Sequence, residues 1–220
     1  MHNSEGKINI SKTARYYTFG NRNTAKHFWF VLHGYGQLAK YFIRNFNHLN
    51  PDEYFIVAPE GFHRFYLNGF DGRVGATWMT KEARLDDIDD YVKFLDQVFD
   101  TTMSDKLDAD FTCFGFSQGV ATASRWIAYG KHKPKTAILW AGSFPPDLEP
   151  VAASKSFASI KTFCCVGTED PFVKENQIDE TKKHLAALNI EAEWISYSGD
   201  HKIPTDELNR VIEIFLTEKQ

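Results

Sequence analysis

The sequence lacks any long apolar run. Its beginning, Met1–Lys7, has no apolar segment of the kind that a secretory leader needs. No later stretch approaches the roughly 20 apolar residues of a membrane-spanning helix. We therefore expect a protein without a membrane span, located in the cytoplasm.

Cysteine is also scarce. The chain has three cysteines, Cys113, Cys164 and Cys165, an odd number of which two are adjacent. This pattern does not indicate a disulfide framework. All three fall in segments that we expect to be strands, where a free thiol usually serves as a small core hydrophobe.

Positive charge is not in excess, and metal-binding patterns are missing. The formal net charge of −4 argues against a nucleic-acid partner or an anionic membrane surface. No His-x-x-x-His pair or phosphate-binding glycine-rich signature occurs, so we expect no metal and no cofactor. The histidines without ligand spacing are His2, His27, His48, His63, His132 and His184.

What the chain does contain is an alternation of apolar, strand-like runs with helical periodicity. This order is typical of an α/β protein whose mostly parallel sheet is flanked by helices. Without a repeat or linker, we expect one domain over residues 1–220. The expected strands are Arg15–Phe19, Phe28–Leu32, Tyr54–Ala58, Phe111–Phe114, Ala137–Trp140, Thr162–Val166 and Glu193–Tyr197, with 7–12 as a possible edge strand. The expected helices are Ala39–Leu49, Arg84–Phe99, Gln118–Tyr129, Lys174–Leu188 and Thr205–Leu216.

A short motif, Gly115–Gly119 (Gly-Phe-Ser-Gln-Gly), joins an expected strand to an expected helix. The glycines are needed because a Cβ at either position would clash with the neighbouring strand or helix. A serine at the apex of so sharp a turn has a strained backbone and presents its hydroxyl outward. Ser117 is therefore a candidate nucleophile of a hydrolase.

A serine nucleophile needs a base to take its proton and a carboxylate to orient that base. In an α/β sheet such groups follow the carboxyl ends of strands. Asp170 follows the strand Thr162–Val166, and His201 follows Glu193–Tyr197. The chain order Ser117, Asp170, His201 is the order expected for an α/β-hydrolase.

Three other carboxylates are rivals of Asp170 as the acid. Glu169 is one residue off the pattern, and Asp200 is badly placed to receive a ring N–H from its sequence neighbour, His201. Asp147 follows the preceding strand and is the strongest rival.

The chemistry also needs two backbone amides that stabilise an oxyanion. The amide of Gln118 lies at the start of the helix after the nucleophile, where the helix dipole also helps. The amide of Tyr35, between two glycines in the loop His33–Gln37, is the second candidate.

Two long segments are expected to be loops. Gly142–Ile160 is too short for a separate lid domain, whereas Gly61–Glu82 is rich in aromatic residues and long enough to suggest a function. Its aromatics are expected either to line an apolar acyl or alcohol pocket or to form a cluster that fixes the loop. The candidates for substrate binding are Phe62, Tyr66, Phe70 and Trp78, together with Phe116 and Phe144.

From about Phe28 to its end, the chain resembles the phospholipase/carboxylesterase family of α/β-hydrolases, which includes acyl-protein thioesterases. The resemblance rests on Leu32–Gly36, Gly115–Gly119, Ala141–Pro145, Gly167–Pro171 and Gly199–His201. It implies the α/β-hydrolase fold, with Ser117 as nucleophile, Asp170 as acid and His201 as base. Tyr35 and Gln118 would be the oxyanion donors. Ala141 departs from the family's serine, and Gly61–Glu82 matches poorly beyond Trp78, so the resemblance does not extend to substrate choice.

We therefore expect a serine hydrolase that cleaves a carboxylic ester or thioester of a small or acyl-chain substrate through an acyl-enzyme. Acyl-protein thioesterase, lysophospholipase and small-ester carboxylesterase are alternatives within this class, and the oligomeric state stays open. A non-catalytic α/β-hydrolase binding protein is disfavoured, because the chain keeps all three residues of the triad.

Overall fold

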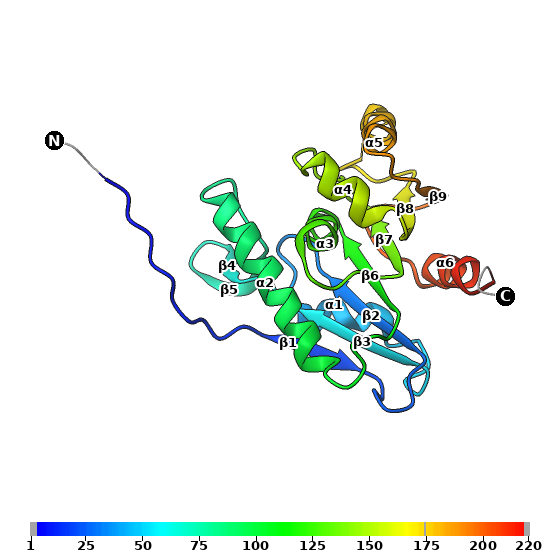
Figure 1. The fold of residues 1–220 in the computed structure, drawn as a ribbon, viewed down its shortest axis with the longest axis horizontal. Coiled ribbons are helices and arrows are strands. Elements are labelled where there is room, and N and C mark those ends of the chain that lie inside the picture. Colours follow the sequence, from blue (N-terminus) through cyan, green and yellow to red (C-terminus); the bar gives the residue numbers. More distant parts are fainter. Residues whose placement is uncertain (1–3, 174, 218–220) are drawn as a thin grey trace.

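The computed structural model describes residues 4–173 and 175–217. A twisted sheet of seven strands runs through the molecule (Figure 1), in the order β1-β3-β2-β6-β7-β8-β9. All neighbours in the sheet are parallel except β1, which pairs antiparallel with β3. The strands are β1 (Tyr16–Phe19), β2 (His27–Leu32), β3 (Tyr54–Pro59), β6 (Phe111–Phe116), β7 (Thr136–Trp140), β8 (Lys161–Gly167) and β9 (Glu193–Tyr197).

Helices cover both faces of the sheet, as the alternating pattern predicts (Figure 1). One apolar core joins the sheet to α2–α5, and a second joins the opposite face to α1 and α6. Because both faces are buried, the central strands are continuous apolar runs, and every residue of β3, β6 and β7 is buried. The helices are α1 (Ala39–Phe42), α2 (Arg84–Thr102), α3 (Gln118–Tyr129), α4 (Pro150–Phe157), α5 (Glu175–Ala187) and α6 (Thr205–Thr217).

The segment 61–82 is not a loop, contrary to the expectation from the sequence. It forms an antiparallel hairpin of β4 (His63–Asn68) and β5 (Asp71–Thr77), separate from the main sheet. Its strands carry charged and exposed residues and lack the uniform burial of the central strands. Two other details were also missed: 142–160 contains α4, and 7–12 forms no strand.

The expected helix 39–49 is shorter than its periodicity predicts. After α1 the chain tightens into the 3-10 helix η1 (Ile43–Phe46). Asn45 donates its side-chain amide to the carbonyl of Phe42 at 2.8 Å, a local bond that competes with α-helical geometry. The first residue of another expected helix, Lys174, lies outside the described residues. Within the described ranges, no helix has the length and apolarity needed to cross a bilayer.

Candidate active site

Ser117 lies at the turn between β6 and α3, in an unusual backbone conformation with φ 54° and ψ −117°. Such a conformation costs about 1–3 kcal/mol and persists only where the surroundings enforce it. Here the N–H of Ser117 donates to the carbonyl of Trp140 at 2.9 Å. The turn also packs tightly, because a Cβ at Gly119 would lie 2.1 Å from the carbonyl oxygen of Leu32. The serine is thus held at the carboxyl end of the central strand.

His201 and Asp170 are brought together by the loops that follow β9 and β8. Nδ1 of His201 donates to Oδ2 of Asp170 at 2.7 Å, and the side chain of Asp170 is fully buried. The other oxygen, Oδ1, accepts the amide of Phe172 at 2.9 Å. This hydrogen bond fixes the orientation of the ring and makes Nδ1 a protonated nitrogen.

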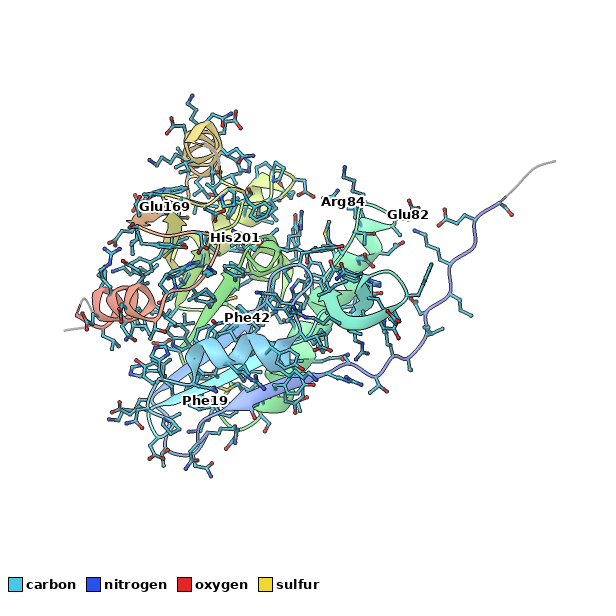
Figure 2. The ribbon with its side chains drawn as sticks, turned by 180° about the vertical axis from the view of Figure 1, so that it is seen from behind. Phe19, Phe42, Glu82, Arg84, Glu169 and His201 are labelled. Carbon is cyan, nitrogen blue, oxygen red and sulfur yellow. The ribbon has the colours of Figure 1, made fainter. Side chains whose placement is uncertain are left out.

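The Ser117 turn and the His201 loop are connected through two aromatic residues. The ring of Phe116 lies against that of His201, with centroids 4.9 Å apart. Trp140 accepts the Ser117 amide through its carbonyl and donates its indole N–H to the carbonyl of Lys202 at 2.9 Å. Figure 2 shows His201 between the turn that carries Glu169 and the helix that carries Phe42.

The described hydrogen bonds do not include one between Ser117 and His201. Catalytic hydrogen bonds are often long in the absence of substrate and tighten in the complex. What links the two residues is Phe116, the neighbour of Ser117, whose ring lies against His201.

None of the rival acids orients His201. Asp147 forms ion pairs with Arg84 and Arg125. Partial burial raises its pKa, but hydrogen bonds and charge from the two arginines outweigh this and hold the pKa below its ordinary value. Glu169 accepts from the hydroxyl of Ser198 at 3.3 Å, and Asp200 pairs with Lys202.

The loop 33–37 lies directly against Ser117. A Cβ added to Gly34 would come within 3.1 Å of Cβ of Ser117. The Gly34 amide donates to Oε1 of Gln37 at 2.8 Å, and the Gly36 amide donates to the carbonyl of Ala76 in β5 at 2.8 Å. The candidate donor Tyr35 lies between these two anchored glycines.

His33 is a buried anchor of this loop, a role that the sequence did not indicate. Its Nε2 accepts the amide of Gly61 at 3.0 Å, so Nδ1 carries the proton and donates to the carbonyl of Gly34 at 2.8 Å. The ring stacks on Trp78 with centroids 4.9 Å apart, and the Trp78 indole donates to the His33 carbonyl at 2.8 Å. Burial lowers the pKa of His33 to about 4, so the ring is neutral at pH 7.

The side chain of Gln118 is the second feature that sequence reasoning missed. Its Nε2 donates to Oγ1 of Thr77 at 2.8 Å and to the carbonyl of Met79 at 3.0 Å. Its Oε1 accepts the amide of Trp78 at 3.2 Å. The residue after the serine therefore attaches the start of α3 to the end of β5.

The six aromatics considered for substrate binding lie in different parts of the structure. Trp78, Phe116 and Phe144 are buried, and Phe62 packs on Phe94. Tyr66 is half-exposed, and Phe70, between the hairpin strands, is 97% exposed. Their role in binding stays a prediction.

Phe144 is the one of the six that borders a cavity next to the serine turn. This cavity, of about 30 Å³, is lined by Val120, Gly142, Phe144 and Val173 among others. Gly142 connects it to the site, because a Cβ there would lie 2.3 Å from the carbonyl oxygen of Ser117.

Phe172 is an aromatic neighbour of the site that the sequence did not single out. It is 71% exposed and packs edge-on against His201, with centroids 4.8 Å apart. Its position two residues after Asp170 was the available signal. Among residues 4–173 and 175–217 there is no cluster of three or more His, Cys, Asp or Glu that could hold a metal ion.

Comparison with solved structures supports the fold. The chain superimposes on acyl-protein thioesterase 2 of Zea mays with a TM-score of 0.71 at 19% identity, covering 93% of this chain and 99% of that one. A phospholipase/carboxylesterase of Dyadobacter fermentans gives 0.69 at 21% identity, with 96% and 100% covered. A Bacillus cereus carboxylesterase gives 0.66 at 16% identity, with 93% and 94% covered. These neighbours confirm the α/β-hydrolase fold.

A comparison with curated proteins finds no match. The family model described as Serine hydrolase (FSH1) matches residues 24–211, which include every residue of the candidate site. Because this match spans most of the chain, the protein belongs to the FSH1 serine hydrolase family and is a hydrolase enzyme.

Proposed function

We propose that Ser117, His201 and Asp170 form a catalytic triad that cleaves carboxylic ester or thioester bonds. The observation that carries this proposal is the 2.7 Å bond from His201 to the fully buried carboxylate of Asp170, beside the strained Ser117 turn. A carboxylate so placed keeps the correct imidazole tautomer and stabilises the imidazolium that forms during the reaction.

In this mechanism Nε2 of His201 takes the hydroxyl proton as Oγ of Ser117 attacks the acyl carbonyl. The tetrahedral oxyanion accepts hydrogen bonds from the amides of Gln118 and Tyr35, the first at the positive end of α3. His201 then gives its proton to the leaving alcohol or thiol. In the second half of the reaction, His201 takes a proton from a water molecule that attacks the acyl-enzyme. It then returns the proton to Oγ of Ser117 as the carboxylic acid leaves.

The position of the two amides supports this assignment. Gln118 is the first residue of α3, and Tyr35 follows Gly34, which lies against Ser117. Within the described part of the chain, neither amide donates to another protein group. Both are therefore available to a substrate oxygen.

The test is hydrolysis of p-nitrophenyl acetate and butyrate, with labelling by a fluorophosphonate probe. We expect Ser117→Ala to lose labelling and about 10⁶ in kcat, the cost of removing a nucleophile of this type. Ser198→Ala, which removes an exposed serine near His201, is the matched control and should keep both. Comparable activity in Ser117→Ala would overturn the mechanism.

Ester and thioester substrates are separated by a second panel. Each acyl chain is presented as an oxygen ester and as a thioester of matched leaving group, and kcat/KM is compared. An absence of turnover and labelling with the wild-type protein would instead favour a non-catalytic binding protein.

A further inference from the structure

A groove of about 580 Å³ opens beside the loop 33–37. One wall comes from α1 and η1, with Lys40, Tyr41 and Asn45, and the other from the hairpin residues 72–74. Residues 36–38 join the two walls. We call this the basic groove, for the charge described below.

The basic groove adjoins the proposed reaction centre. Gly36 borders it two residues after Gly34, whose backbone lies against Ser117. Two residues of chain span at most about 7 Å. Phe42, which also lines the groove, packs on Phe116 with ring centroids 6.1 Å apart. The lining of the groove therefore lies close to the Ser117 turn on the side of Tyr35.

The charged side chains that line the groove are all cationic. Lys40 and Arg73 line it, and no acidic residue does. Nζ of Lys40 lies 4.7 Å from the ring centroid of Tyr41, and Cζ of Arg44 lies 4.9 Å from the same ring. In the described part of the chain, none of these three cations (Lys40, Arg44 and Arg73) forms an ion pair with a carboxylate.

The sequence around the groove departs from the acidic balance of the whole chain. Residues 33–51 contain two cationic and no acidic side chains, although the net charge of the chain is −4. Cations without carboxylate partners, aligned beside a polar groove, create a local positive potential that attracts an anion.

We propose that the basic groove binds a carboxylate group of the ester substrate through Lys40 and Arg73. The proposal rests on the proposed function, because the anion is carried by a substrate whose carbonyl is attacked by Ser117. Arg73 offers a planar, bidentate donor for a carboxylate, and Lys40 adds a second charge. The groove thereby selects charged over neutral esters.

The experiment compares charged and neutral ester pairs that differ only in that anion. On the acyl side, p-nitrophenyl monoesters of adipate and suberate are compared with the same compounds methylated at the free carboxylate. On the alcohol side, the butyrate ester of 4-hydroxybenzoate is compared with that of its methyl ester. The measured quantity is the charged-to-neutral ratio of kcat/KM.

In the double variant Lys40→Ala/Arg73→Ala we expect this ratio to fall about tenfold for the acyl-side pair, the alcohol-side pair or both. The kcat/KM for the neutral ester should be retained. The wild-type ratio should also fall as salt rises, since salt screens exposed charges. Lys155→Ala, an exposed lysine on α4, is the control and should leave the ratio unchanged.

The proposal is overturned if the double variant keeps the wild-type charged-to-neutral ratio for both the acyl-side and the alcohol-side substrates. It is also overturned by an equal loss on charged and neutral esters, which would indicate a structural role. Failure of the proposed function is a separate result, because it appears as activity surviving in Ser117→Ala with any ester.

Discussion

Asp170 is the carboxylate on which the orientation of His201 depends. Replacing it by Asn keeps the shape but removes the charge and disturbs the imidazole tautomer, so we expect kcat to fall about 10⁴-fold with folding retained. Steady-state kinetics with p-nitrophenyl butyrate measures this loss.

Asp147→Asn is the matched control for the rival acid. It weakens the ion pairs with Arg84 and Arg125, so it should lower the denaturation midpoint while kcat per folded molecule stays near that of the wild type. If Asp147→Asn cost as much kcat as Asp170→Asn, the assignment of the acid would be wrong.

The side chain of Gln118 holds the start of α3 against β5, and in the proposed mechanism its amide is an oxyanion donor. Gln118→Met preserves volume but leaves the Trp78 amide without its acceptor and removes one of the two donors to the Met79 carbonyl, which keeps the Thr77 hydroxyl. Because small displacements of catalytic groups are costly, we expect kcat to fall 10- to 100-fold, as an approximate range, with KM little changed. Stopped-flow measurement of acyl-enzyme formation should show that the rate of the acylation step is reduced.

Ser124→Ala is the control for Gln118. Ser124 is a buried polar residue of the same helix, and its hydroxyl donates to the carbonyl of Val120 at 2.8 Å. We expect a stability loss of about 1 kcal/mol and unchanged kcat. A Gln118→Met variant that loses stability alone would show that the side chain only holds the fold.

At the residue scale, the sequence indicated where the candidate catalytic residues lie in the fold, but it did not indicate which side-chain contacts hold the site together. Ser117, Asp170 and His201 follow strands of a parallel sheet, and this topology places them at one edge. The contacts of Gln118 and His33 involve β5 and the segment after β3, whose positions depend on tertiary packing. No local pattern reports such a contact.

At the scale of elements, the hairpin β4–β5 supports the loop that carries Tyr35. Gly75 in β5 approaches Gly36 so closely that a Cβ would lie 2.4 Å from the carbonyl oxygen of Gly36. Gly75→Ala must therefore displace backbone in one of the two elements. We expect kcat to fall at least about tenfold, because the oxyanion donor moves away from its position.

Gly69→Asn tests whether any change in the hairpin has this effect. Gly69 has φ +63° and nothing within 4 Å of an added Cβ, and Asn tolerates this conformation. We expect activity close to that of the wild type, measured on the same neutral ester. Equal losses of activity in the two variants would show that the effect of Gly75→Ala does not depend on its contact with the loop that carries Tyr35.

The sequence predicted all seven strands of the main sheet. The five inner strands are apolar runs because both faces of the sheet are buried there, whereas the edge strands β1 and β9 are only partly buried. The sequence missed the hairpin, whose strand β4 alternates half-buried and exposed residues and includes charged ones. It also missed α4, only eight residues long, whose start is capped by the side chain of Glu149. Short or exposed elements depend on contacts that are distant in sequence, and their local pattern is weak.

At the scale of the whole molecule, His33 couples the stability of the fold to pH. Its pKa is about 4 in the folded protein, because burial disfavours the charged ring, against an ordinary value of 6.5. Between these two values the unfolded chain binds a proton that the folded protein does not bind. The free energy of unfolding therefore falls as pH falls from 6.5 to 4, by about 3 kcal/mol from this residue.

His33→Asn isolates this contribution, because asparagine does not titrate and still offers an acceptor and a donor. We expect the variant to be less stable than the wild type at pH 7.5, since the ring also stacks on Trp78. Urea denaturation from pH 7.5 to 4 should show the two stabilities converging as the pH falls. In this range folding removes a proton from His33 in the wild type, and the variant has no such group. Parallel curves over this range would mean that the folded ring takes up a proton as readily as the unfolded chain does, and burial would then not lower the pKa of His33.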